Sequence, residues 1–147
     1  MATATDGAGP VVVGLDGSDA SLMALRHAVH EAGWRAAELH VVHALDVTPA
    51  VLHLAGDQKI STRDLAESDR EEVWKRATPI LEEVDLEVVR VNRDGKPAAA
   101  LSEYCDEVKA SVLVVGPRGR GRVAEALLGS TAQAVVKTAR CDVLVVK

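Results

Sequence analysis

The chain has 147 residues and a formal net charge of −5 at pH 7, and 48% of its residues are hydrophobic. This acidic balance and an aromatic content of 2% argue against a nucleic-acid-binding surface, which needs basic patches and stacking rings. No apolar run is long enough to span a membrane, and the first residues lack the apolar core of a secretory signal. We expect a cytoplasmic protein with a disordered tail over residues 1–9 and a single domain over residues 10–147.

The first half of the chain begins with a β-branched run over Val11–Leu15, which predicts a strand buried on both faces. Ser18 is well placed to cap the helix that follows, and Gly33 is expected to end that helix. A second apolar run predicts a strand over 39–45. Residues 46–63 have no clear periodicity and predict a long connection.

The second half continues the alternation. Residues 64–84 are rich in Glu, Arg and Ala and predict a helix that is bent or restarted near Pro79. The remaining strands are expected over 86–92, 111–116 and 142–146, and the remaining helices over 96–108 and 130–139. Strands that alternate with helices favour right-handed crossovers. The predicted fold is therefore α/β, a doubly wound five-stranded parallel sheet with helices on both faces, forming a three-layer sandwich.

A glycine motif follows the fourth predicted strand. Gly116 is separated by two residues from Gly119, and nine further residues lead to Gly129-Ser130. A glycine loop between a strand and a helix presents free backbone N–H groups and the positive end of a helix dipole, which suit a phosphate. We expect the amides of Gly129, Ser130 and Thr131 to face phosphate oxygens, with the Ser130 hydroxyl as a further donor. The alternative is a flexible loop whose glycines serve only turns.

Charged residues lie in and near this motif. The loop contributes positive charge that suits a polyphosphate, from Arg118, Arg120 and Arg122. Asp16 follows the first strand, at the edge where open α/β sheets bind ligands. Asp16 is also a candidate to cap the first helix or its turn, and the two roles are compatible.

The chain resembles the universal stress protein family from about Val11 to Lys147. The resemblance rests on the glycine motif, on the start Val11-Val12-Val13-Gly14-Leu15-Asp16-Gly17-Ser18 and on the ending Cys141-Asp142-Val143-Leu144-Val145-Val146-Lys147. The resemblance implies an adenine-nucleotide alpha-hydrolase-like fold, and ATP binding by the members that carry the glycine motif. It puts Gly14, Asp16 and the Ala44 backbone around base and ribose. The full nucleotide-binding set is then Gly14, Asp16, Ala44, Val115, Gly116, Arg118, Gly119, Arg120, Gly129, Ser130 and Thr131. Gly14 and Asp142 depart from the family, since many members have proline there.

Other ligand motifs are weaker. Residues 119–124 match the dinucleotide pattern G-x-G-x-x-A, but they follow the fourth strand instead of the first, so NAD binding is disfavoured. No Gly-Lys-Ser/Thr occurs, so a P-loop lysine is absent. The pair His40 and His43 should lie on opposite faces of a strand, and neither Cys105 nor Cys141 has a partner at ligand spacing. We expect no metal site built by the protein, and Mg²⁺ only if ATP carries it in.

The sequence therefore predicts an ATP-binding stress-response or regulatory module that is not an efficient enzyme. A slow ATPase or phosphotransferase is the competing hypothesis, but Glu125 is the only acid within the loop that could orient a water. Two further hypotheses stay open. The chain is a cyclic-AMP-binding member of the family, or it is an interaction protein whose glycine motif is vestigial. Val143–Val146 is expected at a sheet edge, where it would pair two copies into a homodimer.

Overall fold

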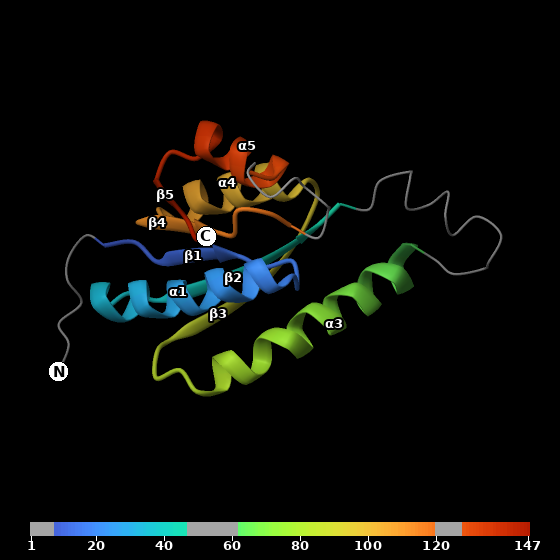
Figure 1. Cartoon of the computed structure of the whole chain (residues 1–147), viewed down its shortest axis with the longest axis horizontal. Coiled ribbons are helices and arrows are strands. Elements are labelled where there is room, and N and C mark those ends of the chain that lie inside the picture. Colours follow the sequence, from blue (N-terminus) through green and yellow to red (C-terminus); the bar gives the residue numbers. More distant parts are fainter. Residues whose placement is uncertain (1–7, 47–61, 120–127) are drawn as a thin grey trace.

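The computed structural model describes residues 8–46, 62–119 and 128–147. These residues form a five-stranded parallel sheet in the order β3-β2-β1-β4-β5 (Figure 1). The strands are β1 (Val11–Gly14), β2 (Leu39–Leu45), β3 (Val88–Asp94), β4 (Val112–Val115) and β5 (Asp142–Val145). The chain runs outward from β1 in one direction and then in the other, which confirms the predicted doubly wound sheet.

Helices cover both faces of the sheet (Figure 1). They are α1 (Asp19–Arg35), α3 (Thr62–Glu82), α4 (Pro97–Val108) and α5 (Ser130–Thr138). Side chains of α1 and α3 share one apolar cluster with the sheet, and side chains of α4 and α5 share the other. The fold is thus the predicted three-layer sandwich. No described helix is long and apolar enough to cross a membrane.

The side-chain alternation of the central strand builds both clusters. Val11 and Val13 contact the α1–α3 cluster, Val12 belongs to the α4–α5 cluster, and none of the three is exposed. The histidines of β2 follow the same alternation, as predicted. His40 bonds Tyr104 of α4 through Nδ1 at 2.8 Å, whereas His43 faces α3. The period of two thus decides which helix pair each strand residue contacts.

His43 ties α3 to the end of β1. Its Nδ1 donates to the Leu15 carbonyl at 2.8 Å, and its Nε2 lies 3.1 Å from the Asp69 carboxylate of α3. His43 is 1% exposed, so both contacts are shielded from water. They hold the segment that leads from β1 into α1 against a long helix.

The predicted end of the first helix was wrong. Gly33 does not end α1, which continues to Arg35 and closes at Ala36 in the left-handed region (φ 48°). The Ala36 amide bonds the carbonyls of Ala32 and Gly33, so an alanine takes the capping position that glycine usually holds. The helix predicted to be bent or restarted near Pro79 is one helix, α3, which runs from Thr62 to Glu82 without a restart.

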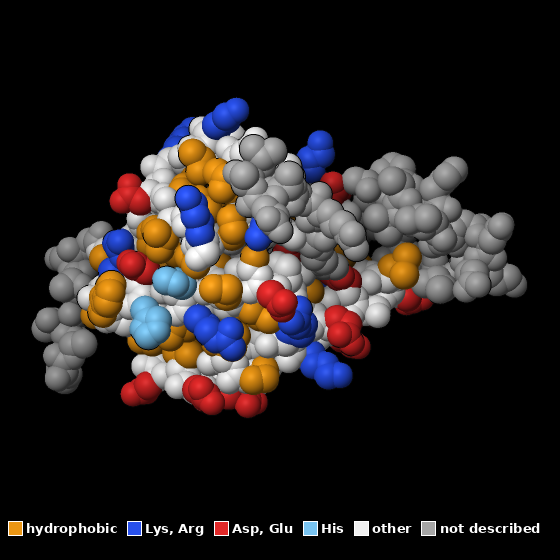
Figure 2. Space-filling model, in the orientation of Figure 1, with side chains coloured by type: hydrophobic (Ala, Val, Ile, Leu, Met, Phe, Trp, Pro, Cys, Tyr) orange, Lys and Arg blue, Asp and Glu red, His pale blue; other side chains and the backbone are white. Residues whose placement is uncertain are grey.

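The third strand begins two residues later than predicted. It covers Val88–Asp94, because its ladder pairs Leu39 with Val88 and continues to Leu45 with Asp94. Tertiary pairing, and not the local apolar run, therefore decides its ends. β5 lies at a sheet edge, as predicted. On the face seen in Figure 2, acidic and basic side chains of the described residues are interspersed.

Candidate functional site

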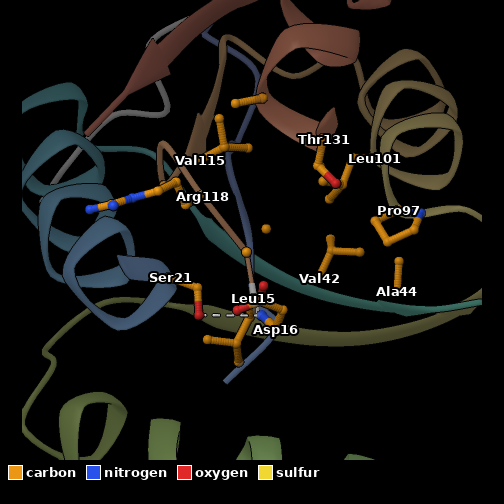
Figure 3. A pocket seen from close by; sticks show the side chains of 14 residues that line it. Leu15, Asp16, Ser21, Val42, Ala44, Pro97, Leu101, Val115, Arg118 and Thr131 are labelled. Atoms are coloured by element: carbon orange, nitrogen blue, oxygen red, sulfur yellow. Dashed lines mark hydrogen bonds between the residues drawn. The ribbon is translucent and has the colours of Figure 1, made fainter. Parts of the chain in front are cut away.

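A hollow opens at the carboxyl ends of the central strands (Figure 3). The interior of the hollow is narrow and has a volume of about 70 Å³. The volume is about 500 Å³ when the open mouth is included. The lining residues are Gly14, Leu15, Asp16, Ser21, Val42, Ala44, Pro97, Leu101, Val115, Gly116, Arg118, Gly119, Thr131 and Ala132. Open α/β sheets bind ligands at this edge, where the strand order reverses.

Three helices begin at the hollow. Ser21 stands in the first turn of α1, Pro97 is the first residue of α4, and Thr131 is the second residue of α5. In α5 the first intrahelical bond runs from the Gln133 amide to the Gly129 carbonyl, at 3.0 Å. The amides before Gln133 therefore precede the helical ladder, as the first amides of a helix do. The positive ends of three helix dipoles meet here, which favours an anion.

One wall of the hollow is apolar. Val42, Ala44, Pro97 and Leu101 lie together on one side in Figure 3, away from Ser21 and Asp16. Ordinary core packing explains Val42 and Leu101, which are buried in the α4–α5 cluster. Because this wall also faces the hollow, it offers a flat apolar ligand group a place out of water.

Gly14 allows that wall to approach the sheet. A Cβ added at Gly14 would lie 2.9 Å from Cδ1 of Leu101, closer than van der Waals contact permits. The glycine therefore has a packing reason at this position. Any larger residue there would push α4 outward or turn the Leu101 side chain.

Asp16 has the capping role that the sequence left open. Its Oδ1 accepts a hydrogen bond from the Ser18 amide at 2.8 Å, and its own amide donates to Ser21 Oγ at 3.3 Å. Ser18 Oγ in turn accepts from the Ser21 amide at 3.1 Å and caps α1. Asp16 also lines the hollow, so capping orients its carboxylate beside the ligand space.

The three glycines of the motif lie close to neighbouring backbone and side chains. A Cβ at Gly116 would lie 3.0 Å from the Ala20 backbone of α1, and a Cβ at Gly119 would lie 2.8 Å from Asp16 Oδ2. At the far end of the motif, a Cβ at Gly129 would lie 3.2 Å from the Arg118 Cα. The glycines therefore permit close approach and do more than serve turns.

The Gly129 amide, predicted to face a phosphate oxygen, is bonded within the loop in this structure. It donates to the Pro117 carbonyl at 2.6 Å and thereby joins the two ends of the loop. This bond satisfies an amide that would otherwise be unpaired before the α5 ladder. Gly129 thus closes the loop, and the amides that follow, of Ser130 and Thr131, begin α5.

Most of the residues predicted for the nucleotide site lie together. Eight line the hollow, namely Gly14, Asp16, Ala44, Val115, Gly116, Arg118, Gly119 and Thr131. Gly129 and Ser130 adjoin it at the start of α5, and Ser130 is exposed. The Arg118 side chain extends away from the apolar wall (Figure 3). Arg120, Arg122 and Glu125 lie outside the described residues.

Sequence reasoning missed several lining residues. Val42 lies two positions before Ala44 on the same strand face, so the period of two could have suggested it. Pro97 and Leu101 are four residues apart on one face of α4, but nothing local indicates that this face reaches the glycine loop. Among the described residues, no three His, Cys, Asp or Glu side chains are grouped to hold a metal ion.

Comparison with known proteins gives this geometry a context. The family model described as the universal stress protein family matches residues 8–147. A universal stress protein of Methanocaldococcus jannaschii is 34% identical over 138 residues, which cover 93% of this chain and 81% of the relative.

Two solved structures show the same fold with a nucleotide bound. A universal stress protein in complex with cAMP is 28% identical with a TM-score of 0.71, covering 96% of this chain and 99% of that one. A universal stress protein of Archaeoglobus fulgidus in complex with dAMP is 25% identical with a TM-score of 0.71, covering 95% and 98%. Because the family model matches residues 8–147 of this chain, the chain belongs to the universal stress protein family.

Proposed function

We propose that this protein binds an adenine nucleotide, with ATP as the preferred ligand, and that it acts as a regulatory binding module. The observation that carries the proposal is the meeting of the glycine loop, three helix N-termini and an apolar wall at one hollow. An adenine nucleotide has the matching parts, which are a flat ring, a ribose and an anionic tail. The relatives solved with cAMP and dAMP support the choice of adenine.

The lining suggests a role for each side of the hollow. The wall of Val42, Ala44, Pro97 and Leu101 would take the adenine ring. Asp16 would accept a hydrogen bond from a ribose hydroxyl, since its carboxylate is already oriented by the Ser18 amide. Because the interior is narrow, the phosphates would lie in the open mouth along the glycine loop.

The start of α5 would take the phosphates. The amides of Ser130 and Thr131 and the hydroxyls of both residues stand at the positive end of α5. The glycine loop lies across from them, held closed by the bond from Gly129 to Pro117. These donors would bind phosphate oxygens, and the family subset with this glycine spacing is the basis for preferring ATP. Mg²⁺ would arrive bound to the ATP phosphates.

Titration calorimetry with ATP, ADP, AMP and cAMP tests the proposal. We expect ATP to bind with a Kd below about 1 mM, which corresponds to about −4 kcal/mol, and to bind more tightly than AMP. GTP serves as the control for the base. The proposal fails if no adenine nucleotide binds in this range and none co-purifies with the protein.

Cyclic AMP is the second candidate ligand, because a relative 28% identical to this chain was solved with it. Cyclic AMP keeps the base and ribose but has one phosphate, so it would use the apolar wall and fewer of the donors at α5. The same titrations separate the two candidates. A Kd for cAMP lower than that for ATP would reassign the preferred ligand without removing the adenine site.

Turnover of bound ATP is expected to be far below the ~1–100 s⁻¹ typical of kinases. Phosphoryl transfer needs a positioned base, and Asp16, the lining carboxylate, already accepts a hydrogen bond from the Ser18 amide. ADP release should be measured with wild type and Asp16→Ala. Turnover in the kinase range that disappears in Asp16→Ala would contradict a binding module and establish an enzyme.

We also propose that two copies pair through β5, at the edge of the sheet. The alternate residues Val143 and Val145 direct their backbone groups away from β4, because Val146 donates to the Val115 carbonyl and neighbours in a strand alternate. An apolar edge with unpaired backbone groups favours pairing with a second copy about a two-fold axis.

A further inference from the structure

The two cysteines of this chain lie together although they are far apart in the sequence, at positions 105 and 141. Cys105 is in the last turn of α4, and Cys141 stands directly before β5. Both belong to the α4–α5 apolar cluster. They also line one surface hollow of about 270 Å³, together with Asp106, Lys109, Ala110 and Arg140. The cluster and the hollow therefore bring together two residues from different elements.

The two thiols differ in their exposure to solvent. Cys105 is 2% exposed, whereas Cys141 is partly exposed. Burial raises the pKa of the Cys105 thiol above its ordinary range, and the Cys141 thiol raises it further through its charge and a hydrogen bond. Cys141 is thus the thiol that a reagent in solution reaches first, and Cys105 is the buried thiol of the same hollow.

We propose that Cys105 and Cys141 form a reversible intramolecular disulfide by exchange with a low-molecular-weight disulfide such as glutathione disulfide. The Cys141 thiolate attacks one glutathione sulfur, and the first glutathione leaves as its thiolate. The Cys105 sulfur, losing its proton to solvent, then attacks Cys141 and releases the second glutathione. Two protein thiols are oxidised by two electrons, and one glutathione disulfide is reduced to two glutathione thiols.

A metal site is the other use of paired thiols. Structural zinc sites take four protein ligands. The described residues around Cys105 and Cys141 do not provide a third cysteine or a histidine, and no group of three metal-binding side chains occurs in the described parts of the chain. Asp106 lines the same hollow but pairs with Arg140, at 3.8 Å. The composition of the hollow therefore favours disulfide formation.

The disulfide would act on the segment that holds the nucleotide motif. The closed loop, residues 105–141, contains β4, the glycine motif and α5. The candidate nucleotide hollow lies at the carboxyl ends of the strands, where the helices begin. The end of α4 and the start of β5 therefore lie at the other side, at the amino ends of the strands. A bond there constrains the unfolded chain without entering the nucleotide hollow. The inference is independent of the proposed nucleotide binding.

The test starts from fully reduced protein at pH 8, incubated with glutathione disulfide under native conditions. We expect alkylation after denaturation to label two thiols before treatment and none afterwards, with the mass lowered by two hydrogens. The product should run as a monomer-sized chain on a non-reducing denaturing gel. Its melting temperature should rise by roughly 5–10 °C and return to the starting value with dithiothreitol. Exchange should accelerate as the pH rises, because the thiolate is the attacking form.

Two variants give the controls. Cys105→Ala keeps the accessible thiol and should stop at the mixed disulfide, gaining the mass of one glutathionyl group. Cys141→Ser keeps only the buried thiol and should resist both glutathione disulfide and alkylation in the folded state. The proposal is overturned if the wild type retains two thiols, accumulates only the mixed disulfide, or forms only a covalent dimer. A folded Cys141→Ser that reacts as fast as the wild type would also overturn it.

Discussion

Replacing Gly119 with valine is expected to weaken ATP binding at least ~100-fold, which corresponds to about 2.7 kcal/mol, while the fold stays intact. Any Cβ at position 119 would lie 2.8 Å from the Asp16 Oδ2 atom. That carboxylate cannot move without losing its 2.8 Å bond from the Ser18 amide. A branched side chain must therefore displace Asp16 or occupy the mouth of the hollow, and either change removes room for the nucleotide.

Stability should be nearly unaffected because Gly119 is exposed and lies outside the helices and strands. Calorimetry with ATP measures the loss of binding, and circular dichroism melting measures the fold. Gly33→Ala is the matched control, since a Cβ there meets no atom within 4 Å and the residue lies on exposed α1 surface. The control should bind ATP as the wild type does. Wild-type affinity in a folded Gly119→Val protein would mean that the glycine loop does not border the ligand.

The order of elements was predictable because each strand and helix has its own periodicity. The buried run at Val11 and the spacing of apolar residues in α1 are local properties, and the alternation of strands and helices then favours one topology. Boundaries depend on tertiary partners, which explains the later start of β3 opposite Leu39. They also depend on backbone choices such as the left-handed Ala36, which no glycine marks in the sequence.

The site was predictable where the chain itself carries a motif. Gly116 and Gly119 were recognised by spacing, and the structure adds why they are glycines, through the contacts with Ala20 and Asp16. The apolar wall was not predictable, since Pro97 and Leu101 reach the hollow only because α4 packs across β1 and β2. Long-range packing of this kind leaves no local signal in one sequence.

The pairing of the two cysteines has the same cause. No spacing rule joins Cys105 to Cys141, and the sequence alone indicated two unpartnered thiols. They meet because α4 ends where β5 begins, at the amino ends of the strands, on the side of the sheet away from the glycine loop. A fold in which strands alternate with helices thus brings residues that are distant in sequence together both at the carboxyl ends and at the amino ends of its strands.

Val145→Pro is expected to convert a homodimer into a monomer. The Val146 amide donates to the Val115 carbonyl at 2.9 Å, so the Val145 amide, one residue earlier, points to the open edge. Proline removes that outward donor and obstructs a second strand, but it leaves the bonds between β4 and β5 in place. Light scattering should change from about twice 15.5 kDa for the wild type to 15.5 kDa for the variant.

Two neighbouring substitutions separate assembly from folding. Val145→Ala shortens the same side chain and keeps the amide, so it should remain dimeric. Leu144→Pro removes a donor that faces β4, and it should lower the melting temperature far more than Val145→Pro because it breaks the sheet itself. A monomeric wild type, or a Val145→Pro protein that stays dimeric, would exclude β5 as the interface. A monomer produced only by Leu144→Pro would instead reflect a damaged sheet, since the open edge depends on β5 staying paired with β4.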